Sequence, residues 1–182
     1  MLGLGNNLIS GVYVESDTLI SSYTSYFTSD NDGWAPYSIE GGSLTQTFNE
    51  SIGGSSGWMK NVFPGNQTGI SGLITTNLFG TDRAIGDYAI LSYKIYFVDD
   101  SGKWTGGDTD VTHVFYIMNK TNTFVADMDE VVSTGNYKTE AATSGTYSRG
   151  PLLRFEDSGD YPLAGAIFYI KDISINVYRP LS

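Results

Sequence analysis

The chain contains no cysteine, and a single histidine, His113, occurs among its 182 residues. Without cysteine the protein can form no disulfide, no thiolate nucleophile and no cysteine-ligated zinc or iron–sulfur centre. A single histidine excludes a His-Glu-x-x-His zinc helix and any other multi-histidine metal site. Because His113 lies within a strand-like apolar pattern, we interpret it as a hydrogen-bonded, half-buried side chain. These absences indicate a protein that is not an enzyme.

Basic residues are also scarce, because 10 Lys and Arg stand against 20 Asp and Glu, a net charge of −10. Binding to nucleic acid or to an anionic membrane depends mainly on Lys and Arg, so we expect neither as a partner. The first basic residue is Lys60, so the basic segment that opens an export signal is missing. The longest apolar runs, such as 166–170, fall far short of the ~20 residues that cross a bilayer. We therefore expect no signal peptide and no transmembrane segment.

Helical spacing is hard to find, because 22 Gly and frequent Ser, Thr, Asn and Asp divide the chain into short segments. Apolar and polar residues instead alternate in several runs, the pattern of half-buried β-strands. The clearest runs are Tyr88–Val98, Val111–Met118 and Ala166–Tyr178. Weaker runs cover residues 43–49, 58–63, 70–77, 123–126, 137–143 and 152–155. About nine strands separated by turn residues predict an all-β fold, an antiparallel β-sandwich or barrel.

The alternation also predicts which side chains face the core. In the run 166–178 the polar Lys171 interrupts the apolar face, and a β-bulge at Lys171-Asp172 would relieve this conflict. The predicted core residues share the apolar face of the three clearest runs: Leu91, Tyr93, Ile95, Phe97, Phe115, Ile117, Ile167, Ile173, Ile175 and Val177.

Residues 1–11 differ from the rest, because three glycines and two asparagines separate isolated aliphatic side chains. Such a segment forms neither a strand nor a helix, and ordering it costs roughly 1–2 kcal/mol of backbone entropy per residue. Contacts outside the domain would have to offset this cost. We therefore predict an N-terminal arm, residues 1–11, and a β-sandwich domain, residues 12–182. The candidate assembly residues of the arm are Leu2, Leu4, Leu8 and Ile9.

Five segments, taken in order, resemble the family 4/9 carbohydrate-binding modules. They are Asp30–Trp34, Ser43–Phe48, the glycine-rich turn before Trp58, Asp87–Tyr93 and Phe168–Ile175. The resemblance spans about residues 12–178 and implies a jelly-roll β-sandwich. An aspartate of the closing strand often helps to hold a structural calcium ion in that family, and Asp172 matches its position. The resemblance thus implies calcium at Asp172, although the other ligands have no match in this chain, and no other cofactor is expected.

The first eleven residues resemble the start of many small phage-encoded virion proteins. This second resemblance implies a structural component of a bacteriophage particle, either a capsid decoration protein or a tail-associated protein, located in the virion. Its expected partners are other virion proteins and further copies of the same chain in a homo-oligomer.

The three tryptophans are the candidate glycan-binding residues, because a flat ring can pack on the apolar face of a pyranose. Trp34 follows a turn and Trp58 begins a strand, so a core position is the favoured interpretation of both. Trp104 lies in the long polar loop 99–110, where no periodicity requires burial. We therefore expect any glycan contact to centre on Trp104.

Three functions remain open at this point. The first is a non-enzymatic virion protein that displays a jelly roll resembling a carbohydrate-binding module. The alternative is a glycan-binding module that recognises a receptor on the host surface. The most remote is a glycan-cleaving enzyme, which only the abundance of acidic residues supports. We interpret the acidic groups at 30–32, 99–100, 108–110 and 127–130 as turn residues rather than as calcium ligands.

Overall fold

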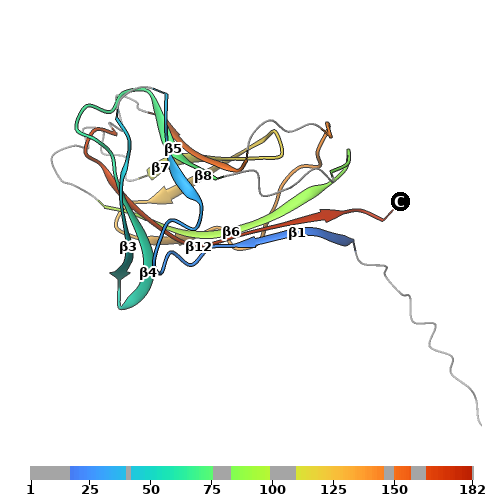
Figure 1. The fold of residues 1–182 in the computed structure, drawn as a ribbon, viewed down its shortest axis with the longest axis horizontal. Helices are drawn as coiled ribbons and strands as arrows, with labels where there is room; N and C mark the ends of the chain where they lie inside the picture. The colour runs from blue at the N-terminus through green and yellow to red at the C-terminus, as the bar shows by residue number, and fades with distance from the viewer. Residues whose placement is uncertain are drawn as a thin grey trace, which may run out of the picture.

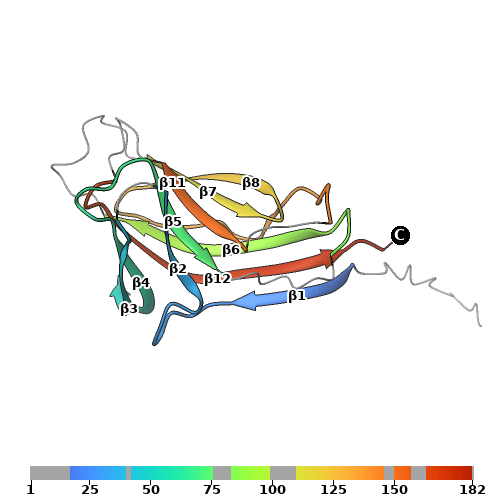
Figure 2. The same ribbon diagram turned by 45° about the horizontal axis from the view of Figure 1, so that its top comes forward.

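The protein is a two-layered β-sandwich, seen in a computed structural model that describes residues 17–39, 42–75, 83–98, 110–145, 150–156 and 163–181 (Figures 1 and 2). All regular secondary structure in these residues is β-strand. The named strands pair antiparallel in two sheets, which confirms the predicted all-β sandwich. Within the same residues, no helix is present that could cross a bilayer.

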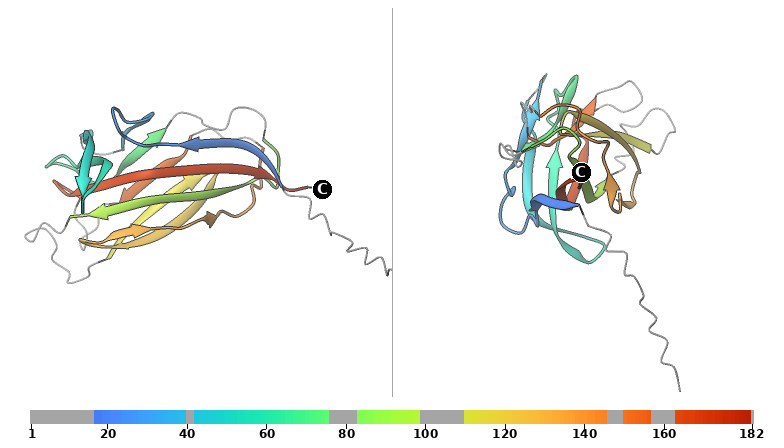
Figure 3. Two further views of the ribbon diagram at one scale, coloured as in Figure 1. Left: turned by 90° about the horizontal axis from the view of Figure 1, so that it is seen from below. Right: turned by 90° about the vertical axis from the view of Figure 1, so that its right-hand side faces the viewer.

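The larger layer, called sheet A, contains seven strands. They are β1 (Thr18–Thr24), β3 (Thr45–Ile52), β4 (Ser55–Val62), β6 (Tyr88–Phe97), β9 (Val131–Ser133), β10 (Tyr137–Lys138) and β12 (Ile167–Arg179). Their order is β10-β6-β12-β4-β3, with β1 also paired to β12 and β9 to β6. Figure 3 shows β6 and β12 side by side along the length of the sandwich.

The smaller layer, called sheet B, contains five strands in the order β2-β5-β11-β7-β8. They are β2 (Trp34–Ser38), β5 (Ile70–Thr75), β7 (Asp110–Ile117), β8 (Lys120–Asp127) and β11 (Leu152–Glu156). Consecutive neighbours in this sheet come from distant parts of the chain, apart from the β7–β8 hairpin.

Each of the nine runs predicted from the sequence overlaps an observed strand, whereas β1, β2 and β9 were not predicted. Strand β1 is rich in Ser and Thr, and β9 has three residues, too few for a visible alternation. Strand β2 contains Pro36, which lacks the N–H that an interior strand needs. The edge position of β2 tolerates this loss, and only the tertiary structure reveals it.

The predicted β-bulge at Lys171-Asp172 is present. Between two pairs of the β12–β6 ladder, β12 advances from Lys171 to Ser174 while β6 advances from Lys94 to Ser92, so β12 carries one extra residue. Asp172 takes a left-handed backbone conformation with a φ of 53°. A one-residue insertion reverses the side of the sheet to which every following side chain points.

This reversal corrects one predicted core residue. Before the bulge, Phe168 and Ile170 are buried, whereas Ile167 is only half-buried and points outward. After the bulge the buried residues are Ile173, Ile175 and Val177. The other nine predicted core residues are buried in the cluster between the sheets: Leu91, Tyr93, Ile95, Phe97, Phe115, Ile117, Ile173, Ile175 and Val177.

Candidate functional site

The outer face of sheet B, the face turned away from sheet A, brings together side chains from three distant segments. Phe155 of β11 is buried in the core, so its neighbour Arg154 points to the outer face. The register places Tyr37 of β2 opposite Gly72 of β5, and Gly72 opposite Arg154. On the other side of β11, Tyr116 of β7 lies two residues from the position that pairs with Arg154. The two tyrosines therefore flank the arginine across the sheet.

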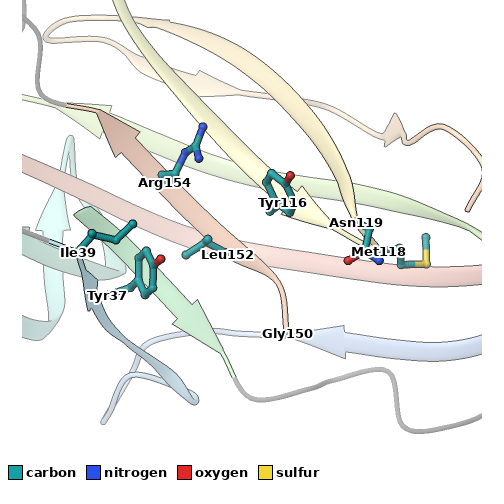
Figure 4. Close-up of a pocket in the computed structure, with 8 residues that line it drawn as sticks. All are labelled: Tyr37, Ile39, Tyr116, Met118, Asn119, Gly150, Leu152 and Arg154. Atoms are coloured by element: carbon teal, nitrogen blue, oxygen red, sulfur yellow. The ribbon is translucent and has the colours of Figure 1, made fainter. Parts of the chain in front are cut away.

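A hollow of about 330 Å³ opens on this face. Its lining residues come from β2, β7, β11 and the turns beside them: Tyr37, Ile39, Tyr116, Met118, Asn119, Gly150, Leu152 and Arg154. Figure 4 shows Tyr37 and Ile39 on one side, Tyr116 on the other, and Leu152 and Arg154 of β11 between them. The hollow thus combines two aromatic rings, an apolar floor and polar groups.

Gly72 explains why there is space between Tyr37 and Arg154. It is the one position in this row of the sheet without a side chain. A Cβ atom at Gly72 would overlap the carbonyl oxygen of Leu153 on the neighbouring strand, so strands β5 and β11 could not approach as they do. Glycine is therefore required for the close strand approach, and it also leaves the hollow open.

The turn at one end of the hollow has an unusual backbone. Met118 and Asn119 connect the paired residues Ile117 and Lys120, and both have positive φ values, 50° and 59°. A two-residue hairpin loop with two positive φ values is the type I′ turn, which asparagine adopts readily and methionine does not. The Met118 side chain is buried, which stabilises this strained position. The turn thereby holds Asn119 at the edge of the hollow.

The polar groups of the hollow are available for a ligand. Within the described part of the chain, the guanidinium of Arg154 and the hydroxyls of Tyr37 and Tyr116 make no hydrogen bond or ion pair with another residue. None of the eight described lining residues is acidic, so the hollow lacks the carboxylate pair that glycoside hydrolysis requires. The described residues also contain no group of three or more potential metal ligands. The described lining therefore offers aromatic rings, an amide and a cation to a ligand.

Two of the three candidate tryptophans are not on this surface. Trp34 and Trp58 have exposed fractions of 0% and 1%, so neither ring presents a face to a sugar. Trp34 packs edge-on against Phe115 with the ring centroids 6.1 Å apart. Both rings are buried, as the favoured interpretation of the sequence expected. Trp104 lies outside the described residues, as do Leu2, Leu4, Leu8 and Ile9, and their roles stay predictions.

Asp172, the candidate calcium ligand, is engaged with a cation. Its carboxylate accepts a hydrogen bond from the Lys94 ammonium at 2.9 Å. The Lys171 ammonium lies 3.9 Å from the same oxygen and donates hydrogen bonds to Ser55 and Ser56. The calcium implied by the family resemblance stays a prediction, and Asp172 belongs to no group of three or more potential metal ligands among the described residues.

The acidic turn Asp30–Asp32 serves a structural purpose, as its sequence predicted. The Asp32 carboxylate accepts hydrogen bonds from the backbone N–H groups of Tyr26 and Phe27 at 2.6 and 2.7 Å. The Asp30 carboxylate in turn accepts one from the Asp32 N–H. These bonds hold the connection between β1 and β2.

His113 is more deeply buried than predicted, with an exposed fraction of 1%. Its Nδ1 lies 3.4 Å from the Val111 carbonyl oxygen, which can only accept a hydrogen bond, so Nδ1 carries the hydrogen. Nε2 then accepts from the Tyr93 hydroxyl at 2.5 Å. Burial lowers the pKa of His113 to about 4 and raises the pKa of Tyr93. The pair is a satisfied core contact, and neither residue lines the hollow on the outer face of sheet B.

The architecture defines the class of fold, a jelly-roll β-sandwich like those of carbohydrate-binding modules. The chain is similar to a xylan-binding domain of carbohydrate-binding module family 22, with a TM-score of 0.55 and 10% identity over 88% of this chain and 96% of that domain. It is also similar to the family 22 xylan-binding domain of a Paenibacillus barcinonensis protein, with a TM-score of 0.50 and 14% identity over 91% and 98% of the two chains.

A third similar structure contains the family 22 and GH10 modules of Clostridium thermocellum endo-1,4-β-D-xylanase 10B with xylohexaose. Its TM-score is 0.51 at 14% identity, and the match covers 88% of this chain and 29% of that one. No protein-family model and no curated protein matches the chain. At these identities the likeness shows the fold. It supports the carbohydrate-binding-module resemblance and gives no support to a virion origin.

The residues of the hollow were missed in the sequence, although one signal was present. Tyr116 lies on the opposite side of its strand from the core residue Phe115, so alternation alone predicts an outward aromatic ring there. Tyr37 lies on an unpredicted strand, and Arg154 is one charge within a short apolar run. Nothing in the sequence indicates that these three side chains meet.

Proposed function

We propose that this protein is a carbohydrate-binding module whose ligand lies in the hollow on the outer face of sheet B. The observation that carries the proposal is the hollow itself, in which Tyr37 and Tyr116 flank the unpaired Arg154. Aromatic rings pack on the C–H faces of sugars, while guanidinium and amide groups hydrogen-bond to hydroxyls. The similar structures named above as xylan-binding support the same function.

The architecture favours this function over catalysis. A sheet presents its outer side chains at fixed spacings of about 7 Å along each strand, which suits the repeating units of an extended chain molecule. The rigid pairing of β5, β11 and β7 means that little conformational entropy is lost on binding. The absence of a carboxylate among the described lining residues leaves no group to cleave a glycosidic bond there.

The virion role inferred from the N-terminal arm depends on residues 1–11, which lie outside the described residues. The described sandwich offers no observation that favours it. A glycan-binding module on a particle would combine both interpretations, with the glycan on the host surface, and the glycan-binding part can be tested alone.

The test is to measure binding of the full chain to xylohexaose by titration calorimetry, and to soluble neutral polysaccharides by affinity electrophoresis. We expect Tyr37→Ala and Tyr116→Ala each to weaken binding about tenfold, the equivalent of roughly 1.4 kcal/mol. Tyr26→Ala is the matched control, because Tyr26 is an exposed tyrosine outside the hollow. Binding that survives both hollow variants, or that Tyr26→Ala weakens equally, would contradict the proposed site.

A further inference from the structure

We infer that the hollow recognises a sugar that carries an anionic group, and that Arg154 binds this group. The inference rests on the proposed function and names its ligand class. Its starting point is the charge of Arg154, because the binding of a neutral glycan does not require a cationic side chain. Neutral hydroxyls can be bound by amides and hydroxyls, whereas a guanidinium is matched in charge and geometry by an anionic oxygen pair.

Arg154 is exceptional among the cations of this protein. The chain has 20 acidic residues for 10 basic ones, so a cation finds an acidic neighbour easily. Every other Lys or Arg in the described residues has a partner. Lys94, Lys120 and Arg179 form ion pairs with carboxylates. Lys171 donates a hydrogen bond to Ser55, and Lys60 and Lys138 lie over tyrosine rings. Arg83 has a further contact. Arg154 alone in this set has none.

The surroundings of Arg154 leave the position open for an anion. Glu156 is on the same face of β11 two residues away, yet the two side chains form no ion pair in the described structure. The neighbouring positions in the row are Gly72 on β5 and Val114 on β7, neither of which can bond a guanidinium through its side chain. Among the described residues that the register places on the outer face of sheet B, Arg154 is the only cation.

The two tyrosines then set the position of the sugar. Tyr116 is a diagonal neighbour of Arg154 across the β11–β7 ladder, and such pairs lie about 7–8 Å apart, within reach of long side chains. Tyr37 lies across the gap left by Gly72. A sugar ring packed on either tyrosine therefore presents its substituents to the guanidinium. A carboxylate or a sulfate ester on that ring supplies the missing partner.

The experiment compares oligosaccharides that differ only in charge. The probes are a xylo-oligosaccharide bearing one glucuronosyl group, the same compound with its carboxyl group reduced to an alcohol, and a sulfated xylo-oligosaccharide. A galacturonate hexamer and its carboxyl-reduced form provide a second backbone. Titrations are run at about 0.15 M salt, where screening over ~8 Å removes most of the repulsion from the acidic protein surface.

We expect an anionic probe to bind at least about tenfold more tightly than its neutral counterpart, and Arg154→Gln to remove that difference. Arg154→Lys should retain part of it, because it keeps the charge and loses the planar fork. Lys60→Gln is the matched control, since it removes the same charge on sheet A and should keep the full difference. A preference for carboxylate or for sulfate identifies the source of the anionic group.

The failures are distinguishable. Equal binding of charged and neutral probes, with loss in Tyr116→Ala, would leave the proposed glycan site in place and overturn the anion inference. A charge preference that Arg154→Gln and Lys60→Gln reduce equally would also overturn it, because the effect would then come from net charge. Absence of binding to every probe would overturn the proposed function together with the inference.

Discussion

At the scale of single residues, the pair Tyr93–His113 is a buried polar contact of the described core. The imidazole lies among aromatic rings, with the Phe155 ring stacked at a centroid distance of 6.0 Å and the Phe97 ring at 5.8 Å. A charged imidazolium in such surroundings is strongly disfavoured, which is why burial lowers the pKa of His113 to about 4. The residue that the sequence marks as the one possible catalytic histidine is thereby held neutral in the core.

This burial predicts a dependence of stability on pH. The unfolded chain takes up the His113 proton below a pKa of about 6.5, whereas the folded protein does so only near pH 4. The contribution of His113 is therefore fully present above about pH 6.5, and the free energy of unfolding falls as the pH decreases from there to about 4. The slope from this group is at most about 1.4 kcal/mol per pH unit.

The double variant Tyr93→Phe/His113→Phe removes both polar groups and should lose this part of the slope. Urea unfolding at several pH values between about 4 and 7.5 measures it. Tyr93→Phe alone is the control, because it retains the buried imidazole and should retain the slope. Identical slopes in wild type and the double variant would show that His113 does not titrate on unfolding.

At the scale of elements, the bulge in β12 decides which alternate side chains of that strand face the core. The set changes from one side of the bulge to the other. Lys171 would otherwise lie on the core side together with the isoleucines that follow it. The extra residue moves Lys171 outward, where it bonds Ser55 and lies 5.4 Å from the Trp58 ring centroid. The bulge therefore lets one strand of 13 residues place apolar side chains in the core along its whole length.

The bulge predicts unequal costs for three similar substitutions in β12. Ile170→Ala and Ile173→Ala should each lower the free energy of unfolding by about 2–5 kcal/mol, because both side chains are fully buried. Ile167→Ala should cost about 1 kcal/mol, because Ile167 points outward and is half-buried. Denaturant unfolding gives all three values. A cost for Ile167→Ala equal to that of Ile170→Ala would contradict the observed register.

A second element-scale prediction concerns the contact between β5 and β11. Gly72→Ala should lower the free energy of unfolding by about 3 kcal/mol or more, because the new methyl group overlaps the Leu153 carbonyl oxygen and must force the strands apart. Gly65→Ala is the control, since a Cβ at Gly65 meets no atom within 4 Å. It should change stability by less than about 0.5 kcal/mol. Equal thermal unfolding of both variants would refute the close approach.

At the scale of the whole molecule, the protein is an acidic sandwich whose two outer faces differ. Sheet B carries the hollow, while sheet A carries ion pairs and aromatic contacts such as Lys94–Asp172 and Tyr96–Tyr169. The net charge of −10 keeps anionic polymers away in general, so recognition of an anionic sugar requires a local cation. The division of the faces makes the proposed glycan binding separable from folding.

The N-terminal arm can be tested by truncation. Removing residues 1–11 should leave the unfolding temperature within a few degrees of the full chain, because the described strands begin at Thr18 and the described core residues begin at Phe27. The sequence predicts self-association through the arm, so the truncated protein should not self-associate, which sedimentation velocity measures against the full chain. Unchanged association would show that Leu2, Leu4, Leu8 and Ile9 do not mediate assembly.

Trp104 provides a further whole-molecule prediction, because its loop joins β6 of sheet A to β7 of sheet B. Trp104→Ala should weaken glycan retention and leave thermal unfolding nearly unchanged, as expected for an exposed ring. Combining it with Tyr116→Ala shows whether the two rings contact the same glycan, since independent losses add. Full retention by Trp104→Ala would assign the contact to the hollow alone.

The sequence by itself determined the local properties of this protein. Alternation in 88–97 and 111–117 is strong enough to assign strands and their buried faces, because the side-chain period of a strand is a local property. The conflict at Lys171 was visible for the same reason, and so were the bulge and the turn role of Asp30–Asp32. The resemblance to carbohydrate-binding modules came separately, from five segments between Asp30 and Ile175.

The tertiary structure decided what depends on pairing between distant segments. The position of the bulge relative to Ile167, the edge location of β2 and the burial of Trp34 and Trp58 follow from neighbours that the local sequence does not specify. The hollow is the clearest case, because residues 37, 116 and 154 meet only when β2, β5, β11 and β7 are ordered side by side. Alternation tells each strand which side faces inward, whereas long-range register alone determines which outward side chains become neighbours.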